Sequence, residues 1–351
     1  HKEAGVIDTL IIGGGAAGLY LASFHPRCVI LERGDECGRK LLLTGGGRCN
    51  YTNAAGPEEM ALLFNGNKAF IRKVLYAHTS KDIIAHFRTL GITPVEEDRG
   101  RIFPKGGDAK ALRDALLKGN PRIIHGKAES IRKDGDAFII ETERGRVEAR
   151  RIVIATGGDS FPQTGSDGSG YRLCRQLGHT ISQPYPALAP IVLTPSLSAA
   201  EGVSASVSIK AGKARSEGDI IITRLGISGP AALDISRHLS PDDEIEICFM
   251  RISKETLRMS SGGKTVKNAL SIPPRLSEAL LGSLADKRCA SLSRQELDRI
   301  ESQLSRFKAK AKAIRAGAMN TKGGVSASEI DPRTMGSKLV EGLYFAGDII
   351  D

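Results

Sequence analysis

Residues 13–18, GGGAAG, fit the pattern G-x-G-x-x-G in a place where that pattern can bind a ligand. They follow an apolar, β-branched stretch and precede a segment that predicts a helix. Gly13 permits a tight turn, Gly15 lets a ligand approach the bare backbone, and Gly18 lets the helix pack closely on the strand. The start of the helix offers unpaired N–H groups and a positive dipole end. This chemistry is the binding of a pyrophosphate.

Glu32 ends the next apolar stretch, about 20 residues after the first glycine of this pattern. A carboxylate at that distance binds the ribose hydroxyls of a dinucleotide. Its charge would repel a 2′-phosphate, so the adenosine is expected to carry a free 2′-hydroxyl. FAD and NAD both meet this description, and the two features by themselves do not choose between them.

A second glycine cluster lies in the stretch KLLLTGGGRCNYTN, residues 40–53. Three consecutive glycines disfavour both helix and strand, whereas consecutive bare amides form a concave surface that binds anions. Arg39 and Lys40 add two cations for phosphate charges. Cys49 follows Arg48 and has two interpretations: a thiolate made reactive by the neighbouring cation, or a small residue packed in the loop. The second is favoured because no resolving cysteine accompanies it.

These motifs lie in a chain that alternates strands and helices from its N-terminus. A strand, a glycine turn, a helix and a second strand make a βαβ unit, whose buried parallel strands are expected to be apolar throughout. Further on, Asp-Gly and Arg-Gly turns between short strands predict hairpins. The predicted elements are strands at 6–12 and 28–32, helices at 16–24, within 65–90 and at 109–117, a strand or loop at 96–107, and short strands within 122–154.

The composition changes near residues 184–195, where four prolines mark a boundary. Short strands are expected from there to residue 250, and helices between residues 277 and 316. The densest basic run, residues 305–317, predicts one basic helix. The last segment, residues 342–350, predicts one more buried strand and a turn.

The overall composition sets limits on the function. The 351 residues contain no run of 18 apolar residues, so no membrane-spanning helix is expected. Six cysteines without a Cys-x-x-Cys pair, in a sequence without a signal-peptide pattern, indicate a reducing, cytoplasmic setting. A net charge of +10 can serve nucleic acid or membrane binding, but no stretch interleaves basic with aromatic residues. A solvated basic surface is therefore favoured, and neither a membrane nor a nucleic acid is the expected partner.

Two further motifs favour FAD over NAD. IVIATGGDS, residues 152–160, is an apolar strand that ends in Ala-Thr-Gly-Gly, and GLYFAGDII, residues 342–350, ends in an Ala-Gly-Asp turn. Both resemble flavoproteins of the two-dinucleotide-binding-domain superfamily. The resemblance implies that the Ala-Thr-Gly-Gly segment passes the cofactor and that Asp348 binds the ribityl chain of FAD.

Longer stretches resemble one family of bacterial FAD-dependent oxidoreductases, variously named NAD(P)/FAD oxidoreductases, aminoacetone-oxidase-like proteins or bile-acid-dehydrogenation reductases. The resemblance runs from Val6 to the last residue and implies that FAD is bound non-covalently. The stretches that carry it are GRKLLLTGGGRCNYTN at 38–53, GRIFP at 100–104, ATGGDSFPQTGSDGSGY at 155–171, TRLGISGPAALDISR at 223–237 and GGVSASEIDPRTMGSK at 323–338.

The fingerprint and the resemblance together assign a set of cofactor contacts to this chain. The resemblance implies that the second glycine cluster and its flanking cations wrap the pyrophosphate and ribityl side of FAD, and that Ala128 contacts adenine through its backbone. No catalytic residue and no metal site is assigned. The expected FAD contacts are Gly13, Gly15, Ala16, Ala17, Gly18, Glu32, Arg33, Arg39, Lys40, Thr44, Gly45, Gly46, Gly47, Arg48, Asn50, Ala128, Ala155, Thr156, Gly157, Gly158, Gly347 and Asp348.

The sequence departs from the family at its C-terminus. Members continue past the Ala-Gly-acid turn into a Gly-Gly-Tyr-Asn-Leu-Gln type of helix start, whereas this sequence stops at Asp351, and we expect the natural chain to continue. Many relatives have Glu where Asp348 stands, which keeps the charge and lengthens its reach. No second G-x-G-x-x-G follows a strand, so a dedicated NAD(P)H domain is not expected, although NAD(P)H can dock transiently as the reductant.

We therefore predict an α/β fold, with a Rossmann-like FAD-binding domain and an inserted β-rich subdomain that carries a helical excursion. The predicted boundaries are 4–188 and 317–351 for the FAD-binding domain and 189–316 for the insert, whose helical part is 264–312. The predicted function is an FAD-dependent oxidoreductase that transfers hydride equivalents between a small organic substrate, or NAD(P)H, and flavin N5. Two alternatives remain, a flavin-dependent RNA-modifying protein and a non-catalytic flavin redox sensor.

Overall fold

The chain runs through one unit, crosses into a second and returns to the first. The computed structural model describes residues 6–64, 66–259 and 263–351. The first unit comprises the residues up to Pro184 together with Gly323–Asp351, and the second comprises Tyr185–Lys322. The predicted fold class, an α/β Rossmann-like domain with a β-rich insert, is confirmed. Residues 189–316 of the expected insert fall within the second unit.

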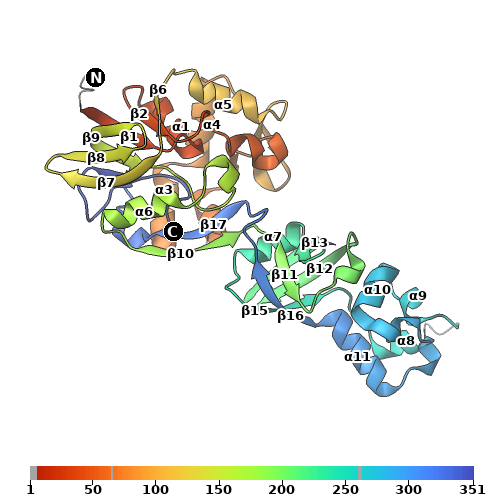
Figure 1. The fold of residues 1–351 in the computed structure, drawn as a ribbon. Helices are drawn as coiled ribbons and strands as arrows, with labels where there is room; N and C mark the ends of the chain where they lie inside the picture. The colour runs from red at the N-terminus through yellow and green to blue at the C-terminus, as the bar shows by residue number, and fades with distance from the viewer. Residues whose placement is uncertain (1–5, 65, 260–262) are drawn as a thin grey trace. The chain divides into compact units, whose positions relative to one another are not determined.

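A mixed sheet forms the centre of the first unit (Figure 1). Its order is β6-β2-β1-β9-β8-β7, and β18 pairs with the second half of β9. Because β6, β2, β1, β9 and β18 run parallel, their carboxyl ends meet at one edge. The strands are β1 (Ile7–Ile12), β2 (Val29–Glu32), β6 (Arg122–His125), β7 (Ala128–Asp134), β8 (Ala137–Thr142), β9 (Gly145–Ile154) and β18 (Leu343–Phe345).

Helices and two smaller sheets surround this central sheet. One smaller sheet has the order β3-β5-β4 and the other pairs β10 with β17. The helices are α1 (Ala16–Phe24), α2 (Pro57–Leu63), α3 (Lys68–Ala77), α4 (Ser80–Thr89), α5 (Ala109–Leu117) and α6 (Ser169–Gln176). The short strands are β3 (Thr52–Asn53), β4 (Pro94–Glu97), β5 (Arg101–Pro104), β10 (Ile181–Ala187) and β17 (Asn320–Val325).

The central strands are apolar on both faces, as a parallel sheet covered on both sides requires. Ile11, Ile30 and Val153 belong to a buried cluster that also contains residues of α1 and α5. Leu10 and Ile152, one residue along the same strands, belong to a second cluster that contains residues of α6 and of the C-terminal return. The alternation of side chains along each strand therefore fixes which helix covers which face.

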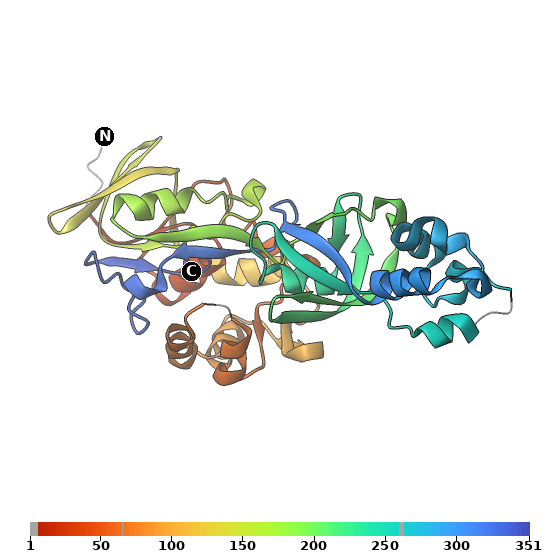
Figure 2. The same ribbon diagram turned by 90° about the horizontal axis from the view of Figure 1, so that it is seen from below.

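A closed β-barrel forms the core of the second unit, in the order β11-β14-β13-β12-β15-β16, with β16 pairing back to β11. The helices α8 to α11 lie together at one end of the barrel (Figure 2). The strands are β11 (Ile191–Thr194), β12 (Ser204–Ala211), β13 (Ala214–Ile222), β14 (Gly226–Ser228), β15 (Asp243–Cys248) and β16 (Phe307–Ala313). The helices are α7 (Pro230–Ser236), α8 (Lys254–Met259), α9 (Val266–Ala269), α10 (Pro274–Leu281) and α11 (Arg294–Ser305).

The predicted basic helix at residues 305–317 is wrong, because Phe307–Ala313 forms strand β16. The run FKAKAKA alternates buried and exposed residues along this strand. A period of two places all the apolar side chains on one face of a strand, whereas it scatters them around a helix. Apart from α7, the helices of the insert lie between Lys254 and Ser305, and the predicted helical part, 264–312, is corrected to these limits.

No helix within residues 6–64, 66–259 and 263–351 combines the length and the apolar character needed to cross a lipid bilayer.

His179 ties the C-terminal return to the segment that follows α6. Its Nδ1 lies 2.9 Å from Oε2 of Glu329, and its Nε2 lies 2.8 Å from Oγ of Ser337. The ring is buried and packs edge-on against Phe345. Burial lowers the pKa of His179, although the Glu329 carboxylate opposes this shift. The ring is therefore neutral at neutral pH, with Nδ1–H donating to Glu329 and Nε2 accepting from the Ser337 hydroxyl.

We expect His179→Ala to lower the free energy of unfolding at pH 7.5 by about 2 to 4 kcal/mol, because it leaves buried polar partners unsatisfied. The lowered pKa means that the unfolded chain takes up the proton first, so the contribution of His179 is present above about pH 6.5 and declines below it. Denaturant titrations at pH 7.5 and 5.5 should therefore show a smaller difference between wild type and variant at the lower pH. His25→Ala, at an exposed histidine, is the control; equal losses for the two variants would contradict the assignment.

Candidate functional site

The glycine turn after β1 is built against the end of β9. The Gly13 N–H donates to the Leu31 carbonyl at 2.9 Å, and Gly13 has a φ of +107°. A Cβ on Gly13 would lie 2.6 Å from the carbonyl oxygen of Ala155, and a Cβ on Gly18 would lie 2.0 Å from that of Gly13. The protein's own backbone therefore requires glycine at both positions, independently of any ligand.

Gly15 differs from these two glycines. Its φ of −75° and ψ of −169° are open to any residue, and a Cβ there would meet no atom within 4 Å. Gly15 is the N-cap of α1, which has neither a capping side chain nor an acidic residue in its first turn. The first N–H groups of α1, from Ala16 onward, are thus left for an anion outside the chain.

Glu32 is fixed in orientation by two backbone amides. The Gly14 N–H donates to its Oε2 and the Gly34 N–H to its Oε1, both at 2.7 Å. Each oxygen keeps a further lone pair for a hydroxyl donor. The carbonyl of Glu32 accepts from the Gly126 N–H at 2.8 Å, which brings the start of β7 at Ala128 toward the same end of the sheet.

Lys40 connects three of the sequence motifs. Its Nζ lies 3.0 Å from Oγ of Ser160 and 3.4 Å from Oδ2 of Asp348. These residues follow β2, β9 and β18, whose carboxyl ends meet at one edge of the sheet. Gly347, next to Asp348, lies against α1, since a Cβ on it would come within 2.9 Å of Cβ of Ala17. The structure thus brings the predicted residues Lys40 and Asp348 together at this edge, with Gly347 against Ala17.

The second glycine cluster adopts a left-handed backbone. Gly45, Gly46 and Gly47 have φ values of +58°, +69° and +85°, which explains why glycine occupies all three positions. All three are exposed, so their amides are accessible. Cys49 beyond them is buried, and burial raises the pKa of its thiol. The interpretation of Cys49 as a packed residue therefore holds over that of a reactive thiolate.

The predicted arginines are engaged by the protein itself. Arg33 pairs with Asp167 at 2.7 Å, and Arg39 donates to the Gln163 carbonyl at 2.8 Å. Although burial opposes it, the pKa of Asp167 falls to about 2 because Ser169 and Arg33 hydrogen-bond to the carboxylate. Two of the four predicted cations, Arg33 and Arg39, thus hold the loop after β9 in place.

Arg48 and its neighbours are also held locally. Its guanidinium pairs with Glu97 and lies 4.4 Å from the centre of the Phe103 ring. The Thr44 hydroxyl donates to the Leu41 carbonyl at 2.7 Å, while Asn50 is exposed next to Cys49. These contacts hold the loop that contains the second glycine cluster. Of the four predicted cations, Lys40 is the one that pairs with Asp348.

Two buried hydroxyls near this edge have no hydrogen-bond partner among the residues that the structure describes. Oγ1 of Thr156 lies so close to α6 that a Cβ on Gly170 would be 1.9 Å from it. The hydroxyl of Tyr171 is also unpartnered, and its pKa is raised by burial and by the charges of Asp159 and Asp348. Unsatisfied buried hydroxyls are costly. Sequence reasoning missed Ser160 and Tyr171, although both lie in the quoted stretch 155–171.

A dinucleotide cofactor fits the residues at this edge. An uncapped helix start and an open Cβ position at Gly15 suit a pyrophosphate, and the clamped Glu32 suits ribose hydroxyls. The unpartnered hydroxyls of Thr156 and Tyr171 suit a polyhydroxyl chain, which can both donate and accept. The remaining predicted contacts, Gly157 and Gly158, continue the backbone from β9 toward Ser160.

Comparison with known proteins finds a matching family model and relatives that align over nearly the whole chain. The family model described as HI0933-like protein Rossmann domain matches residues 7–351. The ribosomal RNA dihydrouridine synthase of Escherichia coli (strain K12) is 30% identical over 369 aligned positions, which cover 98% of this chain and 92% of that protein. The protein of the same name from Haemophilus influenzae is 29% identical, with coverage of 98% and 92%.

A relative with a different name matches over the same extent. The 3-dehydro-bile acid delta(4,6)-reductase of Clostridium scindens is 28% identical over 383 aligned positions, which cover 97% of this chain and 92% of that protein. The family match extends over nearly the whole chain and includes every motif of the site. The chain therefore belongs to the HI0933-like protein Rossmann domain family and is a FAD-dependent oxidoreductase.

Proposed function

We propose that this flavoprotein reduces a carbon–carbon double bond that is conjugated with a carbonyl group, and that NAD(P)H is its reductant. The observation that carries this proposal is the chemistry common to the two names among its relatives. Dihydrouridine is uridine with its C5=C6 bond reduced, and that bond is conjugated with the C4 carbonyl. A delta(4,6)-reductase of a 3-dehydro-bile acid acts on double bonds conjugated with the 3-oxo group. In such conjugated systems a hydride adds to the β carbon, or to the δ carbon of a dienone, and a proton adds to the neighbouring carbon on the carbonyl side, which leaves a saturated carbon–carbon bond.

The cofactor contacts of this chain are part of the proposal. The helix start at Gly15 and Ala16 takes the pyrophosphate, and Glu32 takes the adenosine ribose. Lys40 adds positive charge beside the phosphates and is positioned by Asp348 and Ser160. When bound, FAD supplies a two-electron centre that accepts hydride from a nicotinamide and passes it to the substrate.

Among the candidate substrates, uridine in RNA is the one we favour. Two relatives that match nearly the whole chain are named for ribosomal RNA, and the net charge of +10 suits a polyanionic substrate. The sequence by itself favoured a small molecule, and the bile-acid reductase supports that alternative. Both substrates fall within the proposed reaction class.

We expect Glu32→Ala to weaken FAD binding by about 10- to 100-fold, because a hydrogen bond to a charged group contributes about 1.5 to 3 kcal/mol. The measurement is a fluorescence titration of the apoprotein with FAD. Asp35→Ala, an exposed carboxylate three residues away, is the matched control and should leave the affinity unchanged. Unchanged affinity in Glu32→Ala would refute the role given to Glu32.

Gly15→Ala tests the pyrophosphate position without disturbing the fold. The backbone angles accept alanine and the new Cβ meets no protein atom within 4 Å, so the apoprotein should keep its unfolding midpoint. The methyl group would occupy the space of a bound phosphate, and FAD affinity should fall at least tenfold.

Gly56→Ala provides the control for this substitution. Gly56 is also a helix N-cap, with φ −72° and ψ 165°, and a Cβ on it would likewise meet nothing within 4 Å. Equal FAD affinity in the Gly15 and Gly56 variants would show that no ligand lies over Gly15.

The reaction class is tested by anaerobic stopped-flow absorbance in two steps. NADH or NADPH should bleach the flavin band of the purified protein. The reduced protein, mixed with an unmodified ribosomal RNA transcript, should recover its oxidised spectrum, and mass spectrometry of the digested RNA should find uridine heavier by two hydrogen atoms. Recovery with 2-cyclohexenone and not with RNA would leave the class standing and exclude RNA. Recovery with neither would overturn the class.

A further inference from the structure

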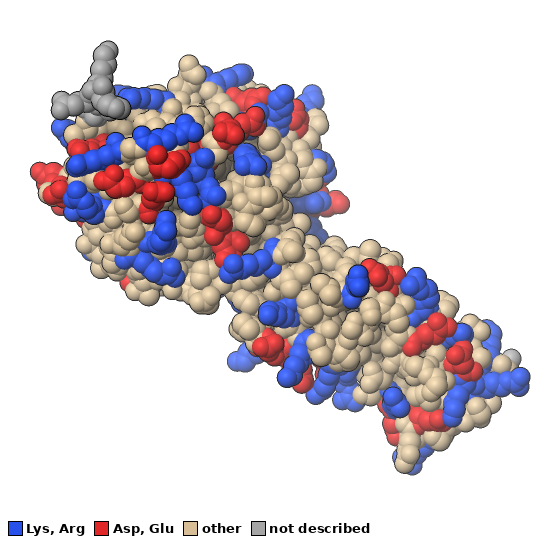
Figure 3. Space-filling model, in the orientation of Figure 1, with Lys and Arg blue, Asp and Glu red and all other residues tan. Residues whose placement is uncertain are grey.

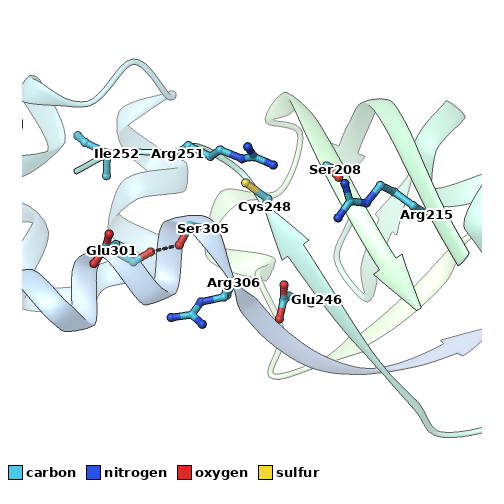
Figure 4. A pocket seen from close by; sticks show the side chains of 9 residues that line it. All are labelled: Ser208, Arg215, Glu246, Cys248, Arg251, Ile252, Glu301, Ser305 and Arg306. Carbon is cyan, nitrogen blue, oxygen red and sulfur yellow. Dashed lines mark hydrogen bonds between the residues drawn. The ribbon is translucent and has the colours of Figure 1, made fainter. Parts of the chain in front are cut away.

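An open pocket of about 360 Å³ lies on the outer face of the barrel in the second unit (Figure 4). Its lining residues come from β12, β13, β15, the segment after β15, and α11 with the residue that follows it. Figure 4 shows Arg215 and Arg251 reaching toward each other, with Ser208 and Cys248 near them, while Arg306 and Glu246 lie on one side. The pocket is therefore bounded mainly by polar and cationic groups and is distinct from the site on the first unit.

No ion pair within the described part of the chain balances the charges of the three arginines of this pocket. Within the described ranges 6–64, 66–259 and 263–351, no carboxylate forms an ion pair with Arg215, Arg251 or Arg306. Of the pocket's two acids, Glu301 lies 3.7 Å from Lys254 instead. Guanidinium groups that stay exposed without a carboxylate are available for an external anion.

The register of the barrel sets further cations beside these. Across three neighbouring strand pairs, Arg215 stands opposite Lys210, Lys210 opposite Glu246, and Glu246 opposite Lys308. Like charges opposite each other on neighbouring strands are destabilising. Glu246 stands between Lys210 and Lys308 in this row, whereas Arg215, at the end of the row, has the cation Lys210 opposite it. An anion bound there would relieve the repulsion.

Strand β16 extends the basic surface beyond the pocket. Lys308, Lys310 and Lys312 alternate with buried residues and are exposed. Residues two apart in a strand lie about 6.7 Å from each other, a spacing comparable with that of successive phosphates in a nucleic acid. Lys308 pairs with Glu244 at 3.4 Å, but both side chains are about two-thirds exposed, so the pair is weak. In Figure 3, basic side chains gather along this side of the barrel with a few acidic ones among them.

We propose that this face of the barrel, formed by Lys210, Arg215, Arg251, Arg306 and the three β16 lysines, binds RNA through its phosphates. The proposal rests on the RNA substrate put forward above. A single phosphate would occupy only part of the pocket and leave the lysine row unused, whereas a polyanion contacts both. The aromatic residues of these strands and their flanks, Phe249 and Phe307, are buried, so no base-stacking platform accompanies the cations. The face therefore holds the RNA backbone without reading its sequence.

The test compares two charge-matched variants of the oxidised holoprotein in filter binding with an unmodified ribosomal RNA fragment. The first carries Arg215→Gln, Arg251→Gln, Lys308→Gln and Lys310→Gln. The control carries Lys73→Gln, Lys81→Gln, Lys110→Gln and Lys118→Gln, four exposed lysines of the first unit. We expect the first variant to bind at least tenfold more weakly at low salt. Its slope of log affinity against log salt should fall by about 2 to 3, since each contact to a single strand contributes about 0.7.

The outcomes separate this proposal from the proposed function. Equal losses in both variants, or no loss in either, would overturn the barrel face as the RNA site. Loss of binding to phosphatidylserine vesicles with RNA binding intact would identify the face as a membrane contact and also overturn it. The filter-binding assay contains no reductant and does not depend on turnover. Its result therefore stays valid even if the stopped-flow assay of the proposed reaction fails. Both variants should reduce 2-cyclohexenone as the wild type does; a loss confined to the first variant would mean that its folding, and not its charge, had changed.

Discussion

The site depends on a close approach between the ends of parallel strands. A side chain on Gly13 would overlap the carbonyl of Ala155, one on Gly18 would overlap Gly13, and one on Gly347 would press on Ala17. Removing side chains at these points lets β1, α1, β9 and the turn after β18 meet at backbone distance. The positions of the residues at this edge, from the start of α1 to Asp348 after β18, all depend on that close contact.

This constraint explains why the site is assembled from distant parts of the sequence. Lys40 reaches Ser160 and Asp348 only because the segments after β2, β9 and β18 end side by side. The arginines nearby contribute mainly to holding these segments: Arg33 and Arg39 fasten the loop after β9, and Arg48 fastens the second glycine cluster to the sheet of β4 and β5. The charges of these arginines are thus partly engaged in contacts within the protein. Lys40 therefore contributes a larger share of the positive charge that is left for a ligand.

The sequence predicted those parts of the fold that depend on local pattern. The helices expected at 16–24 and 109–117 have these limits in the structure, because apolar spacing and flanking turn residues define them locally. The basic run at 305–317 was wrongly predicted to be a helix, because its high lysine content drew attention away from its alternation of polar and apolar residues. That alternation fits a strand, and the strand is stabilised by pairing with β11 and β15, which are tertiary contacts. Pairings such as Arg33 with Asp167, or the unpartnered hydroxyl of Tyr171, depend on tertiary contacts and left no signal in the motifs.

The two units carry different kinds of information about function. The first unit holds the residues proposed to bind FAD, and cofactor contacts by themselves do not distinguish a bile acid from a ribosomal RNA. A substrate as large and as charged as RNA requires contacts far beyond the reacting base, and most of its binding energy comes from phosphates. Under the proposed function, discrimination between substrates must therefore reside in surfaces outside the cofactor edge. The barrel face of the second unit has arginines that form no ion pair with the described residues, and a row of exposed lysines, and it therefore has the charge that such a role requires.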